Sequence, residues 1–223
     1  MQLFPPVLIV CIVTISNFCL GNPVLPDQKV LAGGKGTFDA IRSVLKEAKI
    51  INEVADDFKP RCYVAPFYGS QKIPVAFGNI IKTSKTKGTP SVKITCPRQR
   101  ETSGLTLILT DPDAPSRDNP KWSEMCHFIG LIPIEDKHDL DFSLAGTDFD
   151  EIVEYKPPGP PPKTGYHRYV FLLLEGNNTN LTAPEERQHW GFGKQRHGVR
   201  DWAKQEGLKV VGANFFIEKN KSQ

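Results

Sequence analysis

Two short segments of this sequence concentrate side chains that could do chemistry. The first, TDPDAPSRDNPKWSEMCHFIG, spans residues 110–130 and carries aspartates, a cysteine and a histidine. The second, GPPPKTGYHRY, spans residues 159–169 and adds another histidine. Proteins use carboxylates, thiols and imidazoles for acid–base or nucleophilic catalysis, for binding metals and for holding charged ligands. Each use demands its own spacing, so the spacing of these residues decides between them.

Two of these uses fit the spacing poorly. A metal site would draw on Asp111, Asp113, His127 and His167, but the strong two-histidine zinc signatures are missing, so no metal site is predicted. A nucleophilic site would pair Cys126 with a histidine. Because Cys126 and His127 are adjacent, their side chains would point to opposite faces of a strand. Cys126 is therefore interpreted as a core thiol, and no catalytic residue is assigned.

The remaining use is a pocket that holds a small anion or a headgroup. His127 and His167, together with backbone N–H groups of the Gly- and Pro-rich turns, could donate to a phosphate. Asp111 and Asp113 could accept from an ammonium group or fix the histidine tautomers. A zwitterionic headgroup would satisfy both kinds of charge.

Several residues near these segments have two interpretations. Arg117 and Arg168 either contact the ligand or neutralise the aspartates in a structural network. Asp111 is also expected to form an Asx turn before proline. Tyr155 and Tyr169 either line the mouth of the pocket or pack between sheets.

The polar residues lie at the ends of short runs that resemble strands. These runs are rich in β-branched and aromatic residues, and Pro-, Gly- and Asn-rich turns separate them. They are SVKITC (91–96), LTLILT (105–110), HFIGLIPI (127–134), RYVFLLLE (168–175) and VVGANFFI (210–217). No regular helix follows each strand, so the pattern favours an antiparallel sandwich or barrel-like β domain whose loops carry the function.

Two helices are predicted at the periphery of this β domain. TFDAIRSVLKEAKII (37–51) places its apolar residues on one helical face, with Thr37 as N-cap. GVRDWAKQEG (198–207) closes with Gly207 as a C-cap and leads into the last strand.

The composition excludes some classes of protein. The chain has 223 residues, of which 39% are hydrophobic and 24% charged, as in ordinary globular proteins. A net charge of +3 falls short of the positive stripe that phosphate contacts to nucleic acid require, so no nucleic-acid partner is expected. The G-x-G-x-x-G, P-loop and G-x-S-x-G motifs are absent, and no cofactor is expected.

The N-terminus is typical of a secreted protein. Residues 1–21 have no charged side chain and contain an apolar centre at Val7–Ile15, as a signal peptide does. The apolar run is short for the roughly 20 residues that span a bilayer. We predict a signal peptide over residues 1–21, an extended leader over 22–36 and a single domain over 37–223.

Sequons and cysteines agree with a secretory route. The candidate N-glycosylation sites are Asn177, Asn180 and Asn220. After cleavage the mature chain would keep Cys62, Cys96 and Cys126, an odd number that leaves one thiol unpaired. Because Cys126 lies inside the first polar segment, Cys62 with Cys96 is the candidate disulfide.

The two polar segments together resemble a known family. DPDAPSR (111–117), KWSEMCHF (121–128) and GPPPKTGYHRYVFLL (159–173) are similar to the signature regions of the phosphatidylethanolamine-binding protein family. Those regions are a D-P-D-x-P segment leading to a histidine and a G-x-H-R segment. KWSEMCHF and HWGFGKQRHGVRDWAKQEGLKVVGANFF (189–216) are similar to the fungal branch that includes carboxypeptidase Y inhibitors.

The resemblance implies a mostly β fold of two antiparallel sheets, of Greek-key type, with a few small peripheral helices. It also implies a shallow pocket for phosphate-type anions and phospholipid headgroups. Carried over residue by residue, the ligand-binding set is Asp111, Asp113, His127, Tyr155, Gly159, Pro160, His167 and Tyr169, supported by Pro115, Arg117 and Arg168.

The resemblance carries two further implications for the shape of this site. A cis Ala114–Pro115 peptide would turn the Asp-Pro-Asp loop and aim both carboxylates inward. The mammalian members continue into a C-terminal helix that helps to close the pocket, and this chain stops soon after its last strand, so we expect a more open site. Met125 stands where many members carry an aromatic residue.

Members of the family are not generally enzymes. We therefore expect a secreted, monomeric, non-catalytic protein that binds phospholipid headgroups or phosphate-like anions and can contact a membrane peripherally. The alternative is an inhibitor of a serine carboxypeptidase or a related protease, and a hydrolase using the Asp/His cluster comes third. The expected location is extracellular, vacuolar or in the cell wall.

Overall fold

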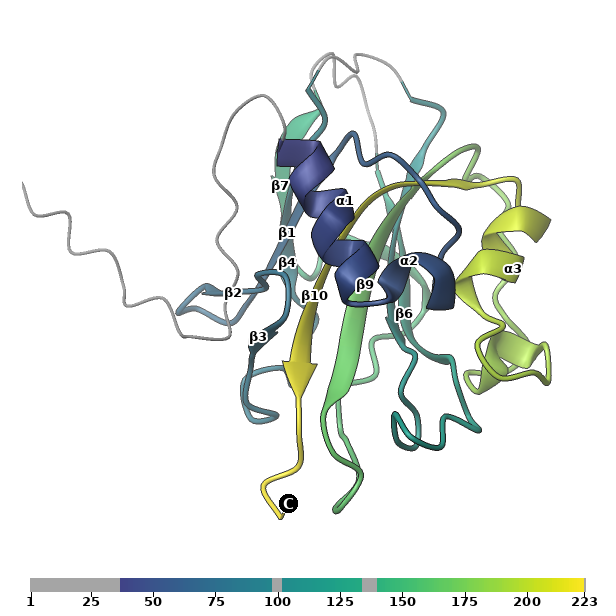
Figure 1. The fold of residues 1–223 in the computed structure, drawn as a ribbon. Coiled ribbons are helices and arrows are strands. Elements are labelled where there is room, and N and C mark those ends of the chain that lie inside the picture. The colour runs from purple at the N-terminus through teal and green to yellow at the C-terminus, as the bar shows by residue number, and fades with distance from the viewer. Residues whose placement is uncertain (1–36, 98–101, 134–139, 223) are drawn as a thin grey trace, which may run out of the picture.

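The computed structural model describes residues 37–97, 102–133 and 140–222, which form two packed β-sheets flanked by helices (Figure 1). The smaller sheet has the strand order β2-β1-β4-β7. Its strands are β1 (Tyr63–Tyr68), β2 (Ile73–Pro74), β4 (Ser91–Thr95) and β7 (Asp141–Leu144). The larger sheet has the order β3-β10-β9-β5-β6-β8. Its strands are β3 (Asn79–Ile80), β5 (Leu105–Asp111), β6 (Met125–Ile132), β8 (Asp150–Val153), β9 (His167–Glu175) and β10 (Lys209–Glu218).

The pairing of the strands is antiparallel apart from one short contact. The two residues of β3 pair in parallel with the end of β10, whereas β10 with β9, β9 with β5 and β5 with β6 are antiparallel. The mostly β fold of two sheets that the sequence predicts is therefore confirmed, as are the predicted strands, with boundaries that shift by one or two residues.

Burial along the strands follows from what covers each sheet. Every residue of β5 and nearly every residue of β9 is buried, because the smaller sheet covers one face of the larger sheet and helices cover the other. In β1 and β4 buried residues alternate with more exposed ones, because only one face of the smaller sheet packs against the core.

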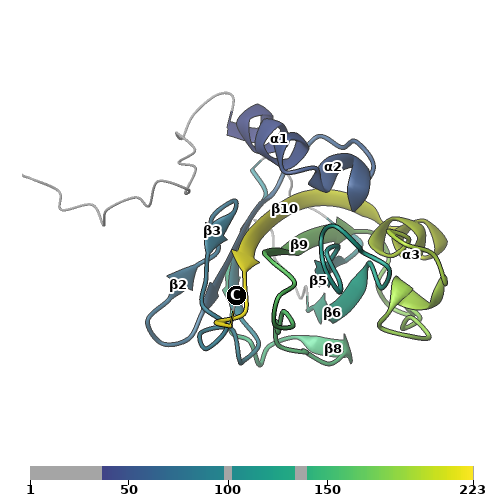
Figure 2. The same cartoon turned by 60° about the horizontal axis from the view of Figure 1, so that its bottom comes forward.

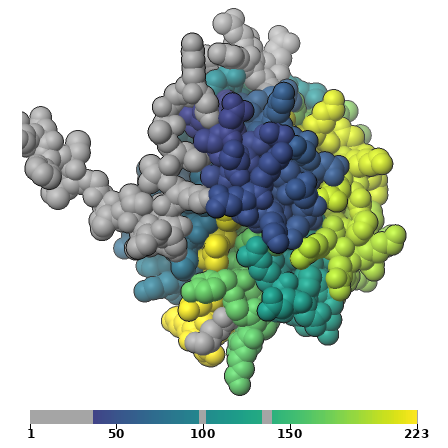
Figure 3. Space-filling model, in the orientation of Figure 1, coloured from purple at the N-terminus to yellow at the C-terminus, as the bar shows by residue number. Residues whose placement is uncertain are grey.

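Two hydrophobic clusters lie on opposite faces of the larger sheet. The alternation of β9 directs Phe171 and Leu173 towards the smaller sheet, and it directs Leu172 and Leu174 towards the helices. The helices are α1 (Thr37–Glu47), α2 (Ile50–Glu53), α3 (Val199–Gln205) and the 3-10 turn η1 (His189–Gly191). Figures 2 and 3 show α1 and α2 lying over this face, with α3 at its edge.

The first predicted helix is shorter than expected. It ends at Glu47, because Lys49 adopts a left-handed conformation (φ 59°) before the short α2 begins. Thr37, predicted as the N-cap, is the first helical residue. The second helix is confirmed as α3, and Gly207 has the positive φ of 70° that a glycine after a helix C-terminus supplies.

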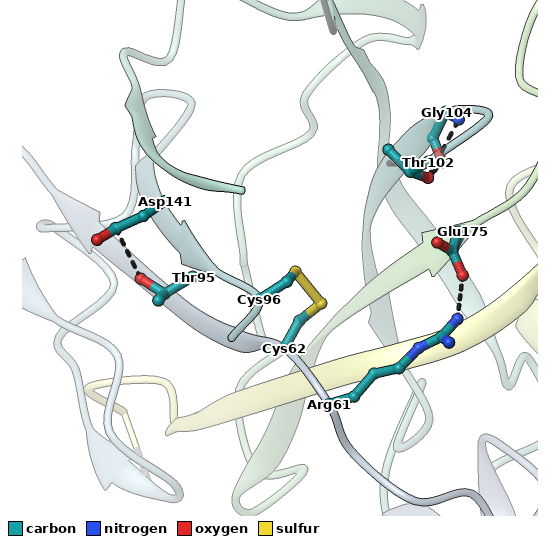
Figure 4. Close-up of a disulfide and its surroundings, with 8 residues drawn as sticks. All are labelled: Arg61, Cys62, Thr95, Cys96, Thr102, Gly104, Asp141 and Glu175. Carbon is teal, nitrogen blue, oxygen red and sulfur yellow. Dashed lines mark hydrogen bonds and ion pairs between the residues drawn. A yellow bond between two sulfur atoms is a disulfide. The ribbon is translucent and has the colours of Figure 1, made fainter. Parts of the chain in front are cut away.

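A disulfide joins Cys62 and Cys96, as predicted (Figure 4). Cys62 precedes β1 and Cys96 follows β4, so the bond connects the ends of two paired strands. Arg61 forms an ion pair with Glu175 of the larger sheet beside it. Among residues 37–97, 102–133 and 140–222, no helix is both long and apolar enough to cross a membrane. The predicted signal peptide and leader lie outside the described residues.

Candidate functional site

Three strands of the larger sheet bring polar side chains to one end of the interface between the sheets. Because β9 is antiparallel to both β5 and β10, the end of β5, the beginning of β9 and the end of β10 lie at the same end of the sheet. Asp111, His167 and Glu218 occupy these three positions. Glu218 is the direct ladder partner of His167. Residues 111, 167 and 218, which are far apart in the sequence, thus meet at this polar cluster.

His167 is held by both of its ring nitrogens. Its Nδ1 lies 2.8 Å from Oδ2 of Asp111, and both side chains are at most 4% exposed. Its Nε2 lies 2.9 Å from Oγ1 of Thr164, whose hydroxyl donates to the carbonyl of Pro161. Both ring nitrogens therefore donate. Burial opposes protonation, but the hydrogen bond and charge of Asp111 outweigh it and raise the pKa of His167. These contacts favour the imidazolium form of His167, paired with the carboxylate of Asp111.

Asp113 serves the opposite face of the sheet. Its carboxylate accepts from Nε and Nη2 of Arg168 at 2.9 and 2.6 Å, and from the Arg168 backbone N–H at 2.9 Å. Asp113 is fully buried. The expectation that both carboxylates of the Asp-Pro-Asp loop point into one pocket is therefore wrong, because alternation along β9 turns Arg168 away from His167. The predicted Asx turn is confirmed: the N–H of Asp113 donates to Oδ1 of Asp111 at 2.7 Å.

Arg168 anchors the helices to this edge of the sheet. Its remaining donors reach the carbonyl of Ala48 and the carboxylate of Glu53, each at 2.7 Å. Burial alone would lower its pKa, but Asp113 and then Glu53 outweigh that effect and raise it. The interpretation of Arg168 as a residue that neutralises an aspartate in a structural network fits these contacts.

Arg117 has no comparable role among the described residues. It is exposed, it makes no ion pair with any residue that the structure describes, and it lines a cavity of about 250 Å³ beside α1 together with Phe77 and Phe215. The neighbouring Ala114–Pro115 peptide is cis, as the resemblance implies. Two further cavities, of about 250 and 420 Å³, lie beside η1 and α3. None of these three cavities contains a residue of the polar cluster.

His127 has one ring nitrogen that makes no hydrogen bond to a described residue. Its Nδ1 lies 2.7 Å from the carbonyl of Lys156. Because a carbonyl only accepts, Nδ1 carries the proton and Nε2 is left with a lone pair when the ring is neutral. Burial lowers the pKa of His127, although the charge of Asp111 opposes this. The ring packs edge-on against Tyr169, with a centroid distance of 5.3 Å.

The Pro-rich segment 157–165 covers the cluster. The N–H of Gly159 donates to the hydroxyl of Tyr169 at 3.3 Å, and Nδ2 of Asn220 donates to the carbonyl of Pro160 at 2.9 Å. Together with the contact between Thr164 and His167, these bonds hold the segment across the site. Asp111, His127, His167 and Tyr169 are consequently 5% exposed or less. The site is therefore more closed than expected.

Tyr68, Thr86 and Glu218 also belong to the cluster, and the motifs do not include them. The hydroxyl of Tyr155 donates to the carbonyl of Thr86 at 2.9 Å and lies 3.2 Å from the hydroxyl of Tyr68. Oγ1 of Thr86 donates to Oε1 of Glu218 at 2.6 Å. Glu218 is fully buried, and burial raises its pKa to about 7. The sequence feature that could have indicated Glu218 is its position at the end of an apolar strand, two residues after Phe216, which places both side chains on the same face.

The nucleophilic alternative finds no support in the geometry. Cys126 packs with Ile108, Ile129 and Trp190 on the helix-facing side of the sheet, whereas His127 faces the other way. Burial raises the pKa of the Cys126 thiol to about 12. The interpretation of Cys126 as a core thiol is therefore confirmed. Within the described part of the chain, no three His, Cys, Asp or Glu residues are grouped so that they could hold a metal ion.

The sequence and the fold both match proteins that are already known. The model of the family described as "Phosphatidylethanolamine-binding protein" matches residues 67–216. The carboxypeptidase Y inhibitor of Saccharomyces cerevisiae is 32% identical over 207 residues, which cover 79% of this chain and 93% of that protein.

Solved structures give the same picture. The structure of a carboxypeptidase Y inhibitor complexed with its cognate proteinase aligns with a TM-score of 0.73 and 33% identity, over 82% of this chain and 96% of that chain. A phosphatidylethanolamine-binding protein from Plasmodium vivax shares the fold, with a TM-score of 0.66 and 24% identity over 81% of this chain and 97% of that chain.

Proposed function

This chain belongs to the phosphatidylethanolamine-binding protein family, and we propose that it binds a phosphate-type anion or a phospholipid headgroup without transforming it. The proposed site is the cluster of Asp111, His127, His167 and Tyr169. The proposal rests on the observation that these buried polar groups converge from three strands, and that two of them can each still form a further hydrogen bond. Nε2 of His127 and the hydroxyl proton of Tyr169 have no hydrogen-bond partner among the described residues.

Some residues of the cluster would contact the ligand, and others would position those residues. His127 and Tyr169 would contact the ligand directly, and the imidazolium of His167 would attract its negative charge. Asp111 would hold His167 in place, as its hydrogen bond indicates. Asp113, with both oxygens occupied by Arg168, would position the loop without touching the ligand.

For a ligand to enter, segment 157–165 would have to move away from the cluster that it covers. The residues that would touch the ligand are 5% exposed or less, and segment 157–165 lies over them through the backbone of Gly159 and Pro160. Moving this segment outward would break few hydrogen bonds and would free the N–H of Gly159 as a further donor. Gly159 and Pro160 would thus serve the site through their backbone, and Tyr155 through its contact with Tyr68 and Thr86.

A titration followed by NMR tests this proposal. Glycerophosphoethanolamine, which carries the headgroup without the acyl chains, is added to the protein while the imidazole signals are recorded. We expect the signals of His127 and His167 to shift. Those of His197, a half-exposed histidine that precedes α3 and pairs with Asp201, should stay in place. A titration in which no signal of the cluster moves contradicts the proposal.

A second function, inhibition of a serine carboxypeptidase, is favoured by a different observation. The similarity to the carboxypeptidase Y inhibitor covers nearly all of that protein at 33% identity, and that inhibitor was solved in complex with its cognate proteinase. The polar cluster is closed and lies between the sheets, so we propose that any protease contact uses the outer surface instead.

An inhibition assay separates the two functions. Mature protein mixed with carboxypeptidase Y should cause a stoichiometric loss of peptidase activity, and a His127→Ala variant should inhibit equally well because His127 is buried. Full peptidase activity at a micromolar excess of the protein rules the inhibitor proposal out. If the His127→Ala variant no longer inhibits the peptidase, the protease contact lies at the cluster.

We retain the proposal of a secreted, monomeric protein with a cleaved segment at residues 1–21 and one domain over 37–223. The sequons offer a test. Asn177 and Asn180 are exposed, whereas the amide of Asn220 donates to Pro160. We expect secreted protein to carry glycan at the first two positions, detected as a mass loss after endoglycosidase treatment. A secreted chain without glycan at either position counts against this route.

A further inference from the structure

Glu218 is a buried acid that the family motifs do not include. It is the last residue of β10 and is fully buried. One carboxyl oxygen, Oε1, accepts from Thr86. The other, Oε2, is buried without a hydrogen-bond partner among the described residues. A buried carboxylate oxygen without a partner is costly, and each one in a native structure calls for a physical reason.

The surroundings of Glu218 belong to the proposed site. Glu218 and His167 are ladder partners, so their side chains leave the sheet on the same face. The charged and titratable groups that act on Glu218 come from every element around it. They are Lys87 before β4, Asp111 at the end of β5, His167 and Tyr169 on β9, Tyr68 on β1 and Tyr155 after β8.

We propose that Glu218 decides when the site accepts an anion: protonated, its free carboxyl oxygen lets the group donate to the ligand, and ionised, it repels the ligand. This inference rests on the proposed function, since it concerns the same site. Two carboxylates in one buried cluster cannot both stay ionised beside an incoming anion without a large cost. Asp111 is held by the His167 imidazolium, which leaves Glu218 as the group that takes up the proton.

The pH window follows from the position of Glu218. Burial raises its pKa to about 7, and the charge of Asp111 acts in the same direction, whereas Thr86, Lys87 and His167 oppose it. Below this pH the carboxyl is neutral and can donate. Above it the site carries an additional buried negative charge, so anion binding should weaken as the pH rises from 6 to 8.

The experiment compares wild type and Glu218→Gln with dimethyl phosphate as the probe. This phosphodiester keeps a single negative charge between pH 5.5 and 8.0 and has no cationic group. Glutamine mimics the protonated acid at every pH and keeps an oxygen for Thr86. With a pKa near 7, about a tenth of the wild-type sites are competent at pH 8.0. Calorimetry should therefore show the variant binding about tenfold more tightly at pH 8.0 and equally at pH 5.5.

Two further variants guard against an indirect effect of the substitution. Thr86→Val removes the hydrogen bond that lowers the pKa of Glu218, so the loss of binding should move to higher pH. Thr106→Val, a buried threonine at the opposite end of β5, should leave the pH profile unchanged. Equal affinity of wild type and Glu218→Gln at pH 8.0 overturns the inference. Absence of binding by wild type at either pH contradicts the proposed function itself.

Discussion

His167 and Arg168 are consecutive residues of β9, yet their side chains serve opposite faces of the larger sheet. His167 pairs with Asp111 on the face towards the smaller sheet. Arg168 pairs with Asp113 on the face towards α1 and α2. The two signature segments therefore meet in two ion pairs on opposite faces of the sheet, one within the proposed ligand site and one that fixes the helices to the sheet.

The first prediction concerns the structural pair. Arg168→Ala would leave the carboxylate of Asp113 buried without its partner, and we expect a loss of about 3–5 kcal/mol in the free energy of unfolding. Urea denaturation measures it. Arg117→Ala, at an exposed arginine without an ion pair among the described residues, is the matched control and should change stability by no more than about 0.5 kcal/mol. Equal effects of the two substitutions would contradict the division between these arginines.

The second prediction concerns the disulfide between Cys62 and Cys96. Closing this loop restricts the unfolded chain, so replacing both cysteines with alanine should cost about 2–4 kcal/mol of stability. Thermal unfolding of the double variant measures the loss.

The Cys126 thiol, buried on the helix-facing side, should react with a thiol reagent only after denaturation. Rapid labelling of the native protein would show that the core around Cys126 is open.

The architecture was the part of this protein most accessible from sequence. The long apolar runs such as LTLILT and RYVFLLLE predict β5 and β9, because strands buried on both faces are apolar almost throughout. β2 and β3 are only two residues long and give no periodicity. β1 contains Pro66, a residue that argues against a strand. Short edge elements depend on tertiary pairing, which local pattern does not encode.

The site was predictable only in part, for a related reason. The motifs identify Asp111, His127 and His167, which the structure brings together. They do not reveal that Asp113 belongs to the other face, because that depends on the turn after β5 and on which residue of β9 faces inward. Glu218 lies more than 90 residues from Asp111 in the chain, and only the register between β9 and β10 places it in the cluster.

The third prediction concerns a second buried acid, Glu124. It is fully buried, one carboxyl oxygen accepts from Thr110 at 3.2 Å and the other has no partner among the described residues. Burial raises its pKa from 4.5 to about 8. The folded state therefore keeps a proton that the unfolded state loses. This contribution to stability is complete below pH 4.5 and is lost as the pH rises to about 8.

Glu124→Gln removes that contribution to the pH dependence. Relative to wild type, the variant should gain stability steadily between pH 4.5 and 8, by on the order of a few kcal/mol, and no further above pH 8. Melting temperatures recorded across this range measure the gain. A Glu185→Gln change at an exposed position should follow the wild-type curve. If Glu124→Gln also follows that curve, Glu124 is ionised in the folded protein.

The cluster around His127 is proposed to hold an anionic headgroup, and calorimetry can measure this role directly. The most direct measurement is calorimetric titration of wild type, His127→Ala and His197→Ala with glycerophosphoethanolamine at pH 6.0. A hydrogen bond to a charged group contributes about 1.5–3 kcal/mol, so we predict that His127→Ala weakens binding by roughly ten- to a hundredfold. His197→Ala, at a histidine whose side chain is 45% exposed, should bind as wild type does. Undiminished affinity of His127→Ala, or no binding by wild type, would contradict this role of the cluster.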